Sequence, residues 1–159
     1  MSQIFPTPRK ILFLPSNYRT MKEQQQVSWI DEMAFETEVN GHKIILDADE
    51  KVGGKDSGPR PKPLMITSLL GCTAMDVISI LQKMRVEVKA FRVYADSELT
   101  EEHPKHYDTI HLVFEFTGKD LPMDKLKKAV NLSEERYCGV SFIYKQVIKM
   151  SSEIKVIEG

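Results

Sequence analysis

The stretch that decides the fold is PKPLMITSLLGCTAMDVISILQKMR, residues 61–85. Pro61 and Pro63 fit only the first turn of a helix, so we expect a helix that begins there and ends near Arg85. Its apolar residues are not confined to one stripe, and a helix that is apolar nearly all round must be covered nearly all round. One sheet can cover only one side of this helix. In a chain of 159 residues the rest must come from a second helix and from another subunit, which predicts a homodimer.

The segment before this helix predicts strands. From Val27 onward the pattern becomes strand-like, and apolar or β-branched residues alternate with glutamates over 35–39. Asn40-Gly41 is a strong signal for a two-residue hairpin turn, with a return strand over 42–47. The glycine- and proline-rich segment 49–63 predicts a rigid turn that leads into the helix.

The segment after the helix predicts more strands and two further helices. Alternating residues predict strands over 86–90 and 110–117, joined by an acidic link over 97–108. Three more elements are expected: a short helix near Pro122 capped by Asp120, a longer helix from Asn131 to about Met150 with a loose capping box closed by Glu134, and a final strand over 154–158. This order of elements is α+β, not a repeating parallel unit.

The composition is that of an ordinary globular protein. Apolar residues make up 42% and charged residues 28%, which predicts one domain over 23–159 after a proline-broken N-terminal arm over 1–22, where only 11–14 could pair as a strand. A net charge of −1 argues against a nucleic-acid partner. The apolar run 64–81 contains Asp76 and several hydroxyl groups, so we interpret it as a core helix and expect no membrane span. No stretch resembles a secretory signal, and two cysteines without one predict a cytoplasmic protein.

Two cysteines carry the candidate chemistry: Cys72 in the apolar helix and Cys138 in a second helix-like run beside Gly139, which leaves room next to the sulfur. A thiol in an apolar helix near another thiol can be oxidised by apolar peroxides and then resolved as a disulfide. The alternative is that each cysteine is a small buried hydrophobe. Asp76 lies one turn after Cys72, and we expect it to cap a neighbouring element, with proton transfer as the alternative.

We predict no cofactor and no metal site from the remaining motifs. The glycines of 53–58 lack the pattern of a phosphate-binding loop. Glu101, Glu102, His103 and His106 could mimic a metal cluster, but they straddle a proline in a polar link, which favours a solvated loop.

Two longer stretches carry a family resemblance. The first runs over 53–85 with Gly71-Cys72-Thr73-Ala74-Met75-Asp76 at its centre, and the second is LSEERYCGVS, residues 132–141. With both cysteines in this order and at a similar separation, residues 27–158 resemble the OsmC/Ohr family, the osmotically induced and organic hydroperoxide resistance proteins. The Gly-Cys-Thr…Asp variant is most similar to the YhfA-like branch.

The resemblance implies both a fold and an activity. The fold is α+β, with antiparallel sheets around a long buried central helix, in an intertwined homodimer with active sites near the subunit interface. The activity is that of a thiol peroxidase: Cys72 attacks an organic hydroperoxide and becomes a sulfenic acid, and Cys138 resolves it as a disulfide. An external dithiol, which in the family can be a lipoyl protein, would then reduce the disulfide.

Two departures from the family pattern concern the charge near the thiol. The active peroxidases carry a Pro-Glu-Glu-like segment at the start of the central helix, whose glutamate helps orient a catalytic arginine; here it reads Pro61-Lys62-Pro63. The arginine expected in the first hairpin is also absent, since that region reads DEMAF, residues 31–35. Because a thiolate needs positive charge nearby, we predict that Lys62 supplies it, with Arg60 or Arg19 as alternatives.

Two hypotheses of function follow. The first is a dimeric thiol peroxidase of the OsmC/Ohr type that reduces organic hydroperoxides. The alternative is a non-enzymatic protein on the same scaffold that binds a small hydrophobic ligand or senses oxidation. The missing glutamate and arginine favour the alternative, whereas the retention of both cysteines favours the first.

Overall fold

The computed structural model describes residues 22–159. Its first sheet is small and antiparallel. It has the order β1-β2-β3, with β1 at Val27–Asp31, β2 at Ala34–Val39 and β3 at His42–Leu46. Asn40 and Gly41 have φ values of 51° and 81°, as a hairpin turn of mirror-image type requires, which confirms the predicted hairpin. The predicted arm, its strand over 11–14 and Arg19 lie outside the described residues, apart from residue 22.

A buried carboxylate organises the loop between β3 and the long helix. Asp47 is 3% exposed and accepts hydrogen bonds from the backbone N–H groups of Ala48, Lys55 and Ser57 and from the Ser57 hydroxyl. These bonds hold the pKa of Asp47 well below its ordinary value, because they favour the ionised form. The loop contains a 3-10 turn, Glu50–Val52, and is the rigid turn that the sequence predicted.

The long helix α1 spans Pro61–Lys83, in agreement with the sequence. Its buried side chains form one stripe, which packs against the second sheet and the later helices: Leu69, Thr73, Val77, Ile80 and Leu81. The opposite face is open within one chain, since Met75 is 76% exposed. Length and composition alone would allow α1 to cross a membrane, a property that it shares with many core helices of soluble proteins.

The second sheet has the order β4-β5-β6, with β4 at Ala90–Leu99, β5 at Tyr107–Thr117 and β6 at Lys149–Ile157. β4 and β5 are antiparallel, but β5 and β6 are parallel, so the expectation of purely antiparallel sheets was wrong. The reason is the connection: the chain leaves β5 through two helices and returns beside it in the same direction, as a helical crossover does. Alternate residues of β5 form the core: Ile110, Leu112, Phe114 and Phe116.

Several predicted boundaries were also wrong. β4 begins at Ala90 rather than Val86, because the residues just after α1 form a turn in which Val86 is buried. It then continues to Leu99 into the predicted polar link. The helix α2, Met123–Leu132, is preceded by Pro122 and not by an Asp120 cap, since Asp120 adopts a φ of 50°.

The predicted helix from Asn131 to Met150 does not exist as one piece. α2 ends at Leu132 and is followed by a π-helical turn, Ser133–Tyr137, so there is no capping box at Asn131. Cys138 is then extended, with φ −72° and ψ 102°, and the short helix α3 spans Gly139–Tyr144. This break in the helix fixes the position of Cys138.

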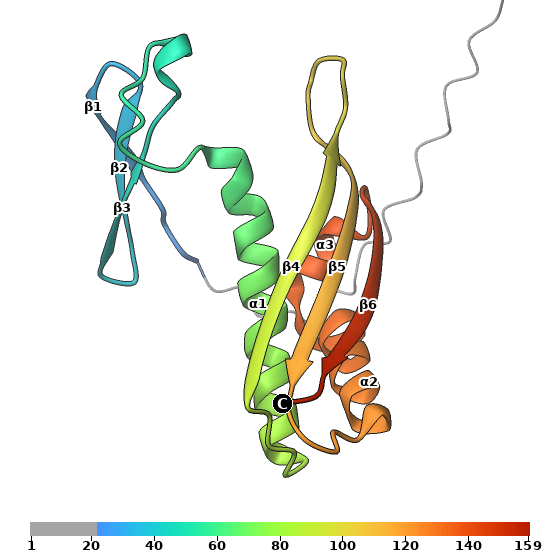
Figure 1. Cartoon of the computed structure of the whole chain (residues 1–159). Helices are drawn as coiled ribbons and strands as arrows, with labels where there is room; N and C mark the ends of the chain where they lie inside the picture. The colour runs from blue at the N-terminus through green and yellow to red at the C-terminus, as the bar shows by residue number, and fades with distance from the viewer. Residues whose placement is uncertain (1–21) are drawn as a thin grey trace, which may run out of the picture.

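The two sheets lie apart and are connected by α1 (Figure 1). α1 runs beside the second sheet, and α2 and α3 lie on the same side of that sheet. The first sheet stands beyond the N-terminal end of α1, away from this body. Its outer side chains are exposed, and Trp29, the only tryptophan of the chain, is 66% exposed.

Candidate functional site

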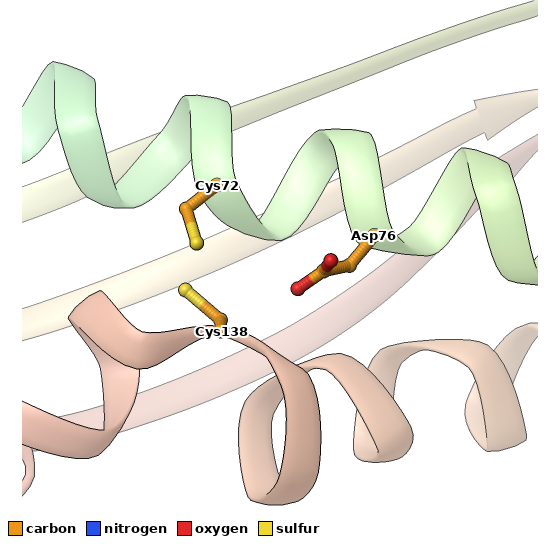
Figure 2. Close-up of side chains that lie close together, drawn as sticks. All are labelled: Cys72, Asp76 and Cys138. Atoms are coloured by element: carbon orange, nitrogen blue, oxygen red, sulfur yellow. The ribbon is translucent and has the colours of Figure 1, made fainter. Parts of the chain in front are cut away.

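Three side chains meet between α1 and the break that precedes α3 (Figure 2). The sulfurs of Cys72 and Cys138 and a carboxylate oxygen of Asp76 all lie within 4.8 Å of one another. Cys72 and Asp76 share one face of α1 because they are four residues apart, and Cys138 approaches from the opposite side. The prediction that distant sulfurs come together is confirmed, and folding of a single chain suffices for it.

The break in the helix orients Cys138. Its backbone N–H donates to the carbonyl of Ser133, at 2.9 Å, and closes the π-helical turn. Its sulfur accepts a hydrogen bond from the N–H of Ser141, at 3.3 Å, so the cysteine side chain caps α3. Cys138 is 2% exposed, whereas Cys72 is half-buried. Of the two cysteines, Cys72 is therefore the less buried.

Asp76 is held by a residue that sequence reasoning missed. The hydroxyl of Ser133 donates to Asp76 Oδ2 at 3.2 Å and also lies 3.4 Å from the carbonyl of Thr73. Ser133 is completely buried. Asp76 thus bonds to a hydroxyl group on the π-helical turn, and not to a helix-capping backbone N–H as we expected. Ser133 lies far from Asp76 in the sequence, and no local pattern points to this role.

The surroundings disfavour the thiolate form of Cys72. Burial first, and then hydrogen bonding to Cys138, raise the pKa of the Cys72 thiol from its ordinary 9.0 to about 11. The negative charges of Cys138 and Asp76 act in the same direction, and only the N–H of Val140 opposes them. The protonated thiol form of Cys72 is therefore favoured at neutral pH.

The predicted cations do not meet Cys72 within one chain. Lys62 is exposed in the first turn of α1. It precedes Cys72 by ten residues, which is about 15 Å along a helix axis and beyond the reach of a lysine. Arg60 is paired with Asp49 and Asp56. The structure therefore brings Cys138 and Asp76 to Cys72, but not Lys62.

Each site cysteine has a glycine beside it in the sequence: Gly71 precedes Cys72, and Gly139 follows Cys138. A side-chain carbon added at Gly71 or Gly139 would meet no atom within 4 Å. A glycine inside a helix, as Gly71 is, costs about 1 kcal/mol relative to alanine. The space beside each glycine would therefore admit a side-chain carbon without contact with distant parts of the chain.

Two cavities of the described chain lie away from the sulfurs. One, of about 560 Å³, is formed by the first sheet with the segment before it, and the other, of about 490 Å³, lies between α2 and β6. Neither cavity is lined by a cysteine. A binding site for a small hydrophobic molecule beside the two sulfurs therefore stays a prediction. His103 and His106 lie in the exposed loop between β4 and β5, as expected.

Comparisons with known proteins agree with this arrangement. The pattern of the family described as OsmC-like protein matches residues 54–153. The protein YhfA of Escherichia coli strain K12 is 34% identical over 135 residues, which cover 84% of this chain and 98% of YhfA.

Solved structures share the fold. A hypothetical protein from Aquifex aeolicus VF5 superposes with a TM-score of 0.77 at 26% identity, over 88% of this chain and 99% of that one. An organic hydroperoxide resistance protein OsmC from Legionella pneumophila superposes with a TM-score of 0.64 at 13% identity, over 86% of this chain and all of that one. The latter identity is low, so this likeness concerns the fold alone.

The Cys72 environment predicts the effect of removing its neighbour. In Cys138→Ala, the hydrogen bond and the charge that raise the pKa of Cys72 are absent, so its alkylation by iodoacetamide should reach half its maximal rate at lower pH than in wild type. Peptide mass spectrometry at Cys72 over pH 7–12 measures this profile. An unchanged midpoint, or one moved to higher pH, would contradict the described contact between the two thiols.

Proposed function

This chain belongs to the OsmC-like protein family, and on that premise we propose that it is a thiol peroxidase that reduces organic hydroperoxides. The observation that supports the proposal is the proximity of the two free sulfurs, within 4.8 Å in a single chain. A disulfide needs a sulfur–sulfur bond of about 2.05 Å, so a small movement of one side chain or of the extended Cys138 would close the gap.

The different burial of the two cysteines supports the order proposed for their reaction. The half-buried Cys72 sulfur, as a thiolate, attacks the distal peroxide oxygen; the O–O bond breaks, an alcohol leaves after protonation, and Cys72 becomes a sulfenic acid. The Cys138 thiolate then attacks the sulfur of Cys72, water leaves, and a disulfide remains. A dithiol, such as the dihydrolipoyl group of a lipoyl protein, reduces the disulfide and restores both thiols.

One observation favours the alternative function, a protein that binds a small hydrophobic ligand or senses oxidation. The environment raises the pKa of Cys72, and the groups that do so include a carboxylate, Asp76. A thiol peroxidase needs the opposite, namely a nearby cation that stabilises the thiolate. The two proposals therefore differ in whether a positive charge reaches Cys72 in the assembled protein.

We further propose a cytoplasmic homodimer in which the open face of α1 is covered by a second copy of the chain. Large apolar side chains are exposed on the first sheet, on α1 and on α3: Trp29, Ile30, Met65, Met75, Phe142 and Ile143. Apolar surfaces of this extent usually mark an interface. The first sheet stands apart from its own body, and it is free to pack against a partner (Figure 1).

The dimer proposal predicts the mass of the protein in solution. Light scattering should give twice the 18.2 kDa of one chain. Met75→Glu places a charge on the open face of α1 and should yield monomers, with a red shift of Trp29 fluorescence if the first sheet loses its cover. Lys128→Glu, on α2, is the control and should remain dimeric. A monomeric wild type would refute the proposal.

The peroxidase proposal predicts the products of a single oxidation. One equivalent of cumene hydroperoxide should remove two hydrogens per wild-type chain, and Cys138→Ser should instead gain one oxygen at Cys72. Intact-protein mass spectrometry distinguishes these products, and Cys72→Ser should do neither. Dihydrolipoamide should then support turnover by wild type. If the wild-type mass does not change, the binding function is favoured.

The role predicted for Lys62 requires that it act across the subunit interface, because it cannot reach Cys72 within its own chain. Lys62→Met should then move the midpoint of Cys72 alkylation to higher pH and slow peroxide reduction. Lys83→Met, at the other end of the same helix, is the matched control. An unchanged alkylation midpoint in Lys62→Met would exclude Lys62 as the source of positive charge.

A further inference from the structure

We infer that Cys72, Asp76 and Cys138 form a binding site for a zinc ion in the reduced protein. The inference goes beyond the peroxidase proposal and does not depend on it. It rests on the convergence of two thiols and one carboxylate from two separate elements into one space (Figure 2). In the part of the chain that the structure describes, this is the one group of three or more potential ligands close enough to share a metal ion.

The distances suit a tetrahedral zinc ion. Zinc binds thiolate sulfur at about 2.3 Å and carboxylate oxygen at about 2.0 Å, which places two sulfurs about 3.8 Å apart in a tetrahedron. All three donor atoms already lie within 4.8 Å of one another, so contraction by about 1 Å completes the arrangement. The site then has three protein ligands and one open position, the arrangement of zinc sites that exchange a bound water.

Hydrogen bonds from surrounding groups hold two of the three ligands in place, as is usual around metal sites. The Ser133 hydroxyl donates to one oxygen of Asp76, and the Ser141 N–H donates to the sulfur of Cys138. Hydrogen bonds of this kind orient ligands and account for a large part of metal affinity. Because Ser133 is completely buried, its hydroxyl holds the Asp76 carboxylate from the protein interior. The carboxylate has no evident role in peroxide attack, but it is a suitable donor for a divalent cation.

The donor set selects the class of metal. Two thiolates disfavour magnesium and calcium, which prefer oxygen ligands, and a mixed sulfur and oxygen set suits zinc. Binding displaces the two thiol protons and involves no change in oxidation state. Because the same two sulfurs would form the disulfide, zinc binding and disulfide formation exclude each other, so zinc would occupy the reduced protein and protect its thiols.

The test is a zinc titration of the reduced, metal-free full chain without peroxide, in competition with a chromophoric chelator. We expect one zinc per chain and the release of about two protons at pH 7. Cobalt(II) should give the charge-transfer absorption of thiolate ligands and the visible bands of a tetrahedral ion. Asp76→Asn should lower the zinc affinity at least about 100-fold, and Ser133→Ala about 10-fold to 100-fold.

Two controls make the outcome decisive. Asp124→Asn, an exposed carboxylate at the start of α2, should bind zinc like wild type. Cys72→Ser should lose much of the cobalt–thiolate absorption. If that variant does not fold, the lower zinc affinity of Asp76→Asn, which retains both thiols, tests the site instead. Absence of stoichiometric zinc binding, or binding that survives in both variants, would overturn the inference. Neither result depends on whether the protein reduces peroxides.

Discussion

The contact between α1 and the break after α2 is the constraint on which the candidate site depends. Cys72 and Asp76 are carried by a rigid helix whose buried stripe is fixed by the core of the second sheet. Cys138 is itself the extended residue between the π-helical turn and α3, and its sulfur accepts a hydrogen bond from the Ser141 N–H. A continuous helix would have carried the Cys138 sulfur in another direction, because side-chain direction follows the backbone.

The sequence predicted most of what depends on local patterns. The prolines at 61 and 63 located the start of α1, and Asn40-Gly41 located the first hairpin, because both features act through the backbone of neighbouring residues. The pairing of Cys72 with Asp76 also came from their spacing on one helix face, whereas Cys138 was singled out only as the second cysteine of the chain. The family resemblance then supplied the expectation that the sulfurs meet.

What the sequence did not predict depends on contacts between distant segments. The parallel pairing of β5 with β6 is set by the helical crossover, and alternation of side chains is the same for either strand direction. The break at Cys138 occurs inside a run with helical composition, where tertiary packing overrides propensity. Ser133 contacts Asp76 across 57 positions of the chain. In the proposed zinc site, Cys138 follows Cys72 and Asp76 by 62 residues or more, so spacing along one helix could not reveal it as their partner.

The remaining question is which positive charge balances this site. Burial, the neighbouring Cys138 thiol and the Asp76 carboxylate all disfavour ionisation of Cys72, and no lysine or arginine of residues 22–159 is among the groups that most affect its pKa. Under the peroxidase and zinc proposals, that charge comes from outside residues 22–159. A lysine from a second copy would activate the thiol toward peroxides, whereas a divalent cation would bind both sulfurs and prevent their oxidation. Under these two proposals the same geometry serves both states, and the cation that reaches the sulfurs determines whether the thiol pair reacts with a peroxide or is held reduced.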